Sequence, residues 1–110
     1  MSFHSIENSQ IIAEEMVIFN FPNGGSRKGR IFITAPVYDI GDKETEPCWW
    51  CLRGIDGLVD VVPLGGNSSL YVLTAAIASV KITLDEFRKA GGQIQFTDGS
   101  SFFLSQTLQI

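Results

Sequence analysis

The sequence predicts an α+β fold in which an antiparallel meander of five to six strands is packed on one face by a single long helix. Short segments rich in β-branched and aromatic residues alternate with glycine-containing turns, and only one stretch has helical periodicity. Because that stretch follows the fourth strand-like segment, the expected order is β-β-β-β-α-β-β.

The chain has 110 residues, of which 45% are hydrophobic and 18% charged. These values fit one domain over residues 1–110, with residues 1–12 as a flexible N-terminal segment. Eight Lys and Arg against twelve Asp and Glu give a net charge of −4. Such a balance disfavours direct binding to nucleic acid, whose affinity comes from cationic side chains, and suits a basic protein partner.

The first two strands are expected at residues 14–21 and 30–38, both rich in β-branched and aromatic residues. The glycine-rich residues 23–29 between them favour a hairpin. We interpret residues 23–30, which include three cations, as a mobile hairpin tip rather than a phosphate loop. Two further strands, residues 48–55 and 58–63, flank Asp56-Gly57, which is a strong signal for a tight turn.

The helix is expected over residues 68–89, where apolar residues recur at spacings of three and four and form one stripe. Asn67 or Ser68 can cap its start, and Gly91-Gly92 ends it. Its first turns, which include Tyr71, are apolar nearly all round, so we expect them to contact another segment or another subunit. A last hairpin is expected from residues 93–97 and 101–105, joined at Asp98-Gly99.

Trp49 and Trp50 must point to opposite faces of a regular strand, so that one ring fills the core and the other lies on the far face. An exposed tryptophan is a frequent anchor of protein interfaces. Packing against another segment of the chain would account for the ring on the far face equally well. Just before this pair, residues 39–46 form an acidic loop. The candidate partner-binding residues are therefore Trp50, Trp49, Asp42, Glu44, Glu46 and Tyr71.

The acidic loop also has a plainer interpretation as a solvated connection. Carboxylates beside aromatic surface suit a basic partner, which they can steer and pair with. The spacing of these residues does not match that of an EF-hand, so no metal site is predicted.

Cys48 and Cys51 form a Cys-x-x-Cys pattern, which in redox enzymes places a reactive thiolate at a helix start. Here the pattern lies in a strand, where residues three apart face opposite sides. We therefore favour two structural thiols over a redox site. With His4 as the single histidine, the sequence offers no catalytic set, and neither an enzyme nor a cofactor is predicted.

Three motifs resemble those of a small uncharacterised bacterial domain family of unknown function. They are the Trp-x-Cys strand at Trp49, the Gly-x-Ser-Ser-Leu helix start at Gly66 and the Gly-Gly strand start at Gly91, and together they cover roughly residues 47–97. The family usually has an acidic residue where Ser68 stands here. The resemblance implies the same fold order and a bacterial or phage origin, and it implies no reaction.

The leading functional hypothesis is a small binding protein that occludes a basic partner, in the manner of an immunity protein or an anti-defence inhibitor of a toxin or nuclease. The alternatives are a homodimeric structural or ligand-binding module and a thiol-redox protein using Cys48 and Cys51. No signal peptide or membrane anchor is recognised in residues 1–20, so the expected location is the cytoplasm.

Overall fold

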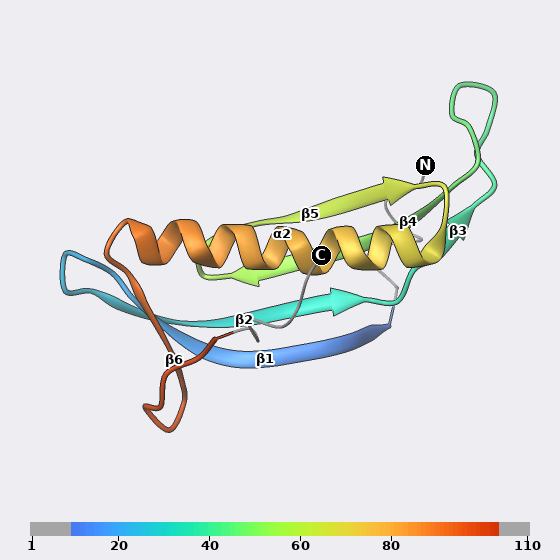
Figure 1. The fold of residues 1–110 in the computed structure, drawn as a ribbon. Coiled ribbons are helices and arrows are strands. Elements are labelled where there is room, and N and C mark those ends of the chain that lie inside the picture. Colours follow the sequence, from blue (N-terminus) through green and yellow to red (C-terminus); the bar gives the residue numbers. More distant parts are fainter. Residues whose placement is uncertain (1–9, 104–110) are drawn as a thin grey trace.

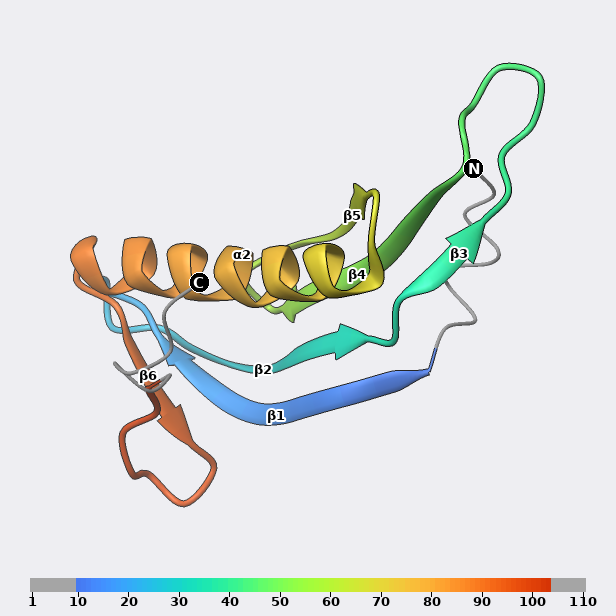
Figure 2. The same ribbon diagram turned by 45° about the vertical axis from the view of Figure 1, so that its right-hand side comes forward.

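Residues 10–103 are described by a computed structural model, in which one helix lies across one face of a six-stranded antiparallel sheet (Figures 1 and 2). This arrangement confirms the predicted α+β class. The elements are β1 (Ile11–Asn20), β2 (Ser26–Thr34), β3 (Val37–Asp39), β4 (Cys48–Asp56), β5 (Val59–Gly66), α2 (Ser69–Lys89) and β6 (Gln93–Phe96).

Strand β4 lies in the interior of the sheet and organises it. On one side β4 pairs with β5, and on the other side it pairs with β2 and β3, which follow one another along the same edge. Beyond β2 come β1 and then β6. The antiparallel meander is confirmed, but five strands precede the helix and one follows it, instead of the expected four and two. Helix α2 carries the chain from the β5 edge back across the sheet, and β6 then pairs with β1.

The predicted strand over residues 30–38 is wrong in its bounds, because the chain is already extended at Ser26 and is broken at Ala35-Pro36. Proline has no N–H for the ladder, so a strand with partners on both sides cannot run through it. Next to the break, the Thr34 hydroxyl accepts a hydrogen bond from the Leu52 N–H at 2.8 Å. The Thr34 side chain thus takes the place of a backbone carbonyl as the acceptor for the Leu52 N–H.

The tight turn at Asp56-Gly57 is confirmed. The Leu58 N–H donates to the Ile55 carbonyl at 3.1 Å, and Gly57 has a φ of 93°, which suits glycine. The hairpin between β1 and β2 is tighter than expected, because residues 26–29 belong to β2 and pair with the end of β1.

Helix α2 begins as its sequence predicts. The Ser68 side chain accepts a hydrogen bond from the Tyr71 N–H at 3.0 Å, which satisfies one of the free donors of the first turn. The helical stripe packs on the sheet face that carries Phe19, Ile31 and Ile55. The fully buried residues of α2 are Val72, Ala76, Val80 and Leu84. The predicted stripe is therefore wrong in its first turn, because Leu70 is 69% exposed and Val72 is buried instead.

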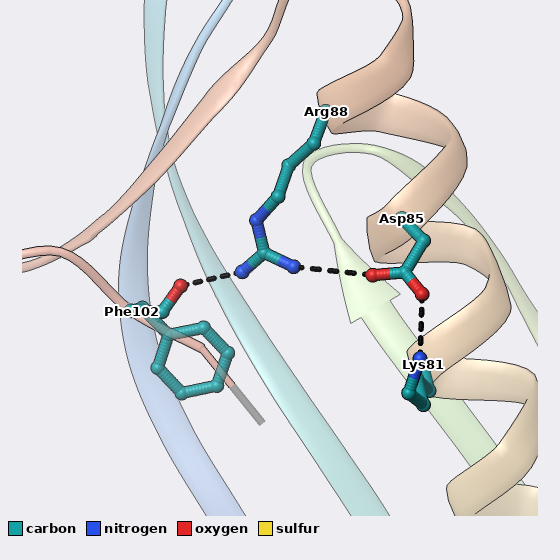
Figure 3. A network of polar contacts seen from close by, with 4 residues as sticks. All are labelled: Lys81, Asp85, Arg88 and Phe102. Carbon is teal, nitrogen blue, oxygen red and sulfur yellow. Dashed lines mark hydrogen bonds and ion pairs between the residues drawn. The ribbon is translucent and has the colours of Figure 1, made fainter. Parts of the chain in front are cut away.

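The last predicted strand, residues 101–105, is not formed as far as the described residues reach. Ser101 makes an isolated bridge to Gln95, and residues 104 and 105 lie outside the described range. The turn at Asp98-Gly99 does form, and it returns Phe102 into the core. Arg88 then fixes this segment to α2, because its guanidinium donates to the Phe102 carbonyl and contacts Asp85 (Figure 3).

The expected N-terminal segment is only partly described. Residues 1–9, with His4, lie outside the described range, whereas Ile11 and Ile12 begin β1 and the Gln10 carbonyl accepts from the Ala35 N–H at 2.7 Å. Strand β1 thus begins within the segment that was expected to be flexible.

The sheet face opposite α2 has buried side chains of its own. Phe32 and Leu52 are buried there, and the Phe32 ring occupies the space where Gly54 has no side chain. The Arg30 guanidinium lies over this ring, 4.3 Å from its centroid. Both faces of β4 thus contain buried apolar residues, as expected for a strand in the interior of a sheet.

Candidate protein-binding surface

The connection between β3 and β4 forms an arm that extends past the start of α2 (Figures 1 and 2). Its tip, residues 40–47, is held by short-range hydrogen bonds. Asp39 accepts from the Gly41 N–H at 2.8 Å, and Asp42 accepts from the N–H groups of Glu44 and Thr45 at 2.8 and 2.9 Å. The loop therefore has a defined turn of the kind that Asp side chains stabilise.

The tip is negatively charged, and its carboxylates form no ion pair within residues 10–103. The N–H groups that bind Asp42 lower the pKa of that carboxyl, so it stays ionised well below neutral pH. Glu44 and Glu46 are exposed, and Lys43 is the one cation in the loop. The arm thus presents carboxylates that are free to pair with an incoming cation.

Aromatic surface lies at the base of the arm. Tyr38 on β3 contacts Trp49 on β4, with ring centroids 5.3 Å apart, and Tyr38 is exposed. Trp49 packs against the core from the same side of the sheet as α2. Ile40, at the start of the loop, is 79% exposed. Tyr38 and Ile40 were not among the predicted partner-binding residues, although a hairpin across residues 40–47 would have placed Tyr38 opposite Trp49.

Trp50 lies on the other face, as the strand period predicts. Its ring covers Gly65 on β5, where a Cβ atom would come within 2.7 Å of it. The indole Nε1–H is buried and has no acceptor among the residues that the structure describes. An unsatisfied buried donor costs about 1–3 kcal/mol, and a partner could reach this buried N–H only if the indole ring moved. Both tryptophans are half-buried, so neither is a fully exposed anchor.

Tyr71 lies at the same end of the molecule, on α2 rather than on the arm. It is 57% exposed, and its ring covers Gly66, the residue that pairs with Trp49. The structure thus brings the predicted residues to one end of the molecule, but on two faces of the sheet and on the helix.

The two cysteines do not form a dithiol site. Cys51 is fully buried against α2 and donates to the Val72 carbonyl at 3.2 Å, whereas Cys48 is half-buried three residues earlier on β4. Burial raises the pKa of the Cys51 thiol to about 11, which is the opposite of activation. This geometry speaks against the thiol-redox alternative.

Arg53 is a buried cation that the sequence analysis did not single out. It is 7% exposed, and it donates to the Ser79 hydroxyl at 3.0 Å and to the Asp60 carbonyl at 3.4 Å. Burial lowers the pKa of its guanidinium. Because its bonds join α2 to β4 and β5, we assign it a structural role.

Other kinds of site have less support. An open hollow near the end of α2 includes Arg88, whose guanidinium is already bound to Asp85 and Phe102. Within residues 10–103 no three His, Cys, Asp or Glu side chains gather in a metal-binding arrangement, and no helix there is long and apolar enough to cross a membrane.

No family model, curated protein or solved structure matches this chain.

Proposed function

We propose that this protein is a small binding module, of bacterial or phage origin, that engages a basic protein partner through the arm between β3 and β4 and acts by occluding it. The observation that carries the proposal is the tip of the arm. Its carboxylates are free of ion pairs among the described residues, and they lie beside the exposed side chains of Tyr38 and Ile40.

The chemistry of the arm suits a segment rich in Arg or Lys. Glu44 and Glu46 can pair with its cations, while Tyr38 offers a ring on which a guanidinium can stack. Rim carboxylates mainly accelerate association and select the partner, whereas buried aromatic contacts supply most of the affinity. An acidic protein that covers a basic site in this way would inhibit a nuclease or toxin without any chemistry of its own.

Affinity capture from the native host tests the proposal. The bait is the wild type or the variant Trp50→Ala with Glu44→Lys and Glu46→Lys, and captured proteins are mapped by cross-linking. We expect a basic partner whose cross-links fall on residues 38–50, and whose recovery falls at least tenfold with the variant. Equal recovery of every partner by both baits would remove the case for this surface.

Two further variants guard against trivial explanations. Because Trp50 is half-buried, the variant Tyr38→Ala with Ile40→Ser changes only exposed side chains and should also weaken binding without unfolding the domain. The control Glu15→Lys with Asp60→Lys makes the same charge change as the two loop reversals, at exposed carboxylates away from the arm, and should bind normally. Equal loss with this control would mean that net charge alone governs capture.

A further inference from the structure

The outer face of α2, turned away from the sheet, carries an apolar stripe. Tyr71, Ala75, Ala78 and Ile82 follow one another at spacings of four, three and four, so they lie along one side of the helix. Tyr71 is 57% and Ile82 59% exposed. A helix on the surface of a monomer normally has polar residues on this side.

The stripe suits contact with another helix. Two alanines at its centre let a second helix approach closely, and the spacing is that of the seam in paired helices. From Tyr71 to Ile82 the stripe runs about 16 Å at 1.5 Å per residue. Its larger side chains stand at the two ends, on either side of the alanines.

The stripe is also complementary to itself. If two copies meet across a two-fold axis between residues 76 and 77, with their helices antiparallel, Tyr71 lies opposite Ile82 of the other copy. Ala75 then lies opposite Ala78 of that copy, so every position of the stripe has an apolar counterpart. A two-fold interface requires this self-complementarity.

The distribution of charge favours the same arrangement. The acidic arm lies beyond the start of α2 (Figures 1 and 2). The other end of α2 has mixed charge, because Arg88 and Lys89 follow Asp85 and Glu86, and Arg88 pairs with Asp85. Antiparallel packing keeps the two acidic arms at opposite ends of the dimer, and it opposes the helix dipoles. Parallel packing would bring like charges together.

We propose that a second copy of this chain packs antiparallel against the outer face of α2, about a two-fold axis between residues 76 and 77. The inference uses a different surface from the arm and does not depend on the proposed function. Helix α2 is about 31 Å long and about 10 Å wide, so it covers roughly 300 Å². Stable interfaces bury about 800 Å² per partner, so the dimer should be weak and form at micromolar or higher concentration.

Sedimentation equilibrium over a range of concentrations tests the dimer. We expect the wild type to approach twice the monomer mass at high concentration, and Ile82→Lys to raise the dissociation constant at least tenfold. The control Leu70→Lys adds the same charge at another exposed apolar residue of α2, which lies off the stripe, and should leave association unchanged. A wild type that stays monomeric throughout, or equal effects of both variants, would overturn the proposal.

Disulfide trapping tests the direction of packing, in a background where Cys48 is replaced by Ser. Chains carrying Tyr71→Cys are mixed with chains carrying Ile82→Cys and oxidised. Antiparallel packing predicts the mixed 71–82 disulfide well above each like pair, because two copies of residue 71 lie about 16 Å apart along the helix axes. A majority of 71–71 and 82–82 products would indicate parallel packing, and a random mixture would indicate no specific interface; either result would overturn the proposal.

Discussion

The buried thiol of Cys51 predicts a specific loss of stability at alkaline pH. The pKa of this thiol is about 11 in the folded protein, against 9.0 for an unperturbed thiol, because burial disfavours the thiolate. At 1.36 kcal/mol for each pKa unit, the difference amounts to about 3 kcal/mol.

The sign follows from which state loses its proton first. Below pH 9 the thiol is protonated in both states, so its contribution is fully present. Between pH 9 and 11 the unfolded chain ionises while the folded protein does not, and unfolding becomes steadily more favourable. At pH 10 the expected loss from this group is about 1.4 kcal/mol.

Urea unfolding of the wild type and of Cys51→Ala at pH 7 and pH 10 measures this effect. Other groups also titrate in this range, but they are common to both proteins and cancel in the difference. The variant is less stable at pH 7 because the substitution leaves a cavity. We expect the difference in free energy of unfolding between the two proteins to be about 1.4 kcal/mol smaller at pH 10. The control Cys48→Ala, which keeps the buried thiol, should follow the wild type.

If the difference in free energy of unfolding between the wild type and Cys51→Ala does not change with pH, the reasoning is refuted. Alkylation of Cys51 in the folded protein, at pH 8, as fast as that of free cysteine would also refute it. The pKa difference alone reduces the thiolate fraction about a hundredfold at that pH. Fast alkylation would also revive the thiol-redox alternative.

Three predictions concern packing and capping, each measured by urea unfolding. Gly54→Ala should destabilise by about 1–3 kcal/mol or more, because the new Cβ would lie 1.9 Å from the Phe32 ring; an unchanged midpoint contradicts this. Ser68→Ala should cost about 1 kcal/mol and Ser68→Asp should cost nothing, since either Ser or Asp caps α2; equal losses would exclude the cap. Arg53→Met should change the free energy of unfolding by less than about 1 kcal/mol. Ser79→Ala should lower it by about 1–3 kcal/mol, because the Arg53 cation loses an acceptor. A larger loss for Arg53→Met than for Ser79→Ala would contradict this.

Several elements could be predicted from the sequence because their causes are local. The apolar periodicity of residues 68–89 and the cap at Ser68 define α2, and Asp56-Gly57 defines the turn between β4 and β5. The period of a strand places Trp49 and Trp50 on opposite faces. Each of these features depends on residues a few positions apart, so no knowledge of distant contacts is needed.

The remaining features were decided by contacts between residues far apart in the chain. Thr34 could end β2 only because the Leu52 N–H lies beside it, and Arg53 is buried only because α2 crosses β4 and β5. Residues 26–29 have little strand character of their own, yet they pair with β1, whereas Ser101 makes only an isolated bridge to Gln95.

The same division holds for the proposed surfaces. Composition determined that the protein is acidic and that Tyr71 lies in an apolar half of the helix, but it did not determine where the charges collect. The tertiary structure placed the carboxylates of the arm at one end of the molecule and the hairpin cations at the other (Figure 1). The physical reason is that charge and exposure at a surface depend on which strands pair and where the helix crosses them, and those pairings join residues that the sequence separates.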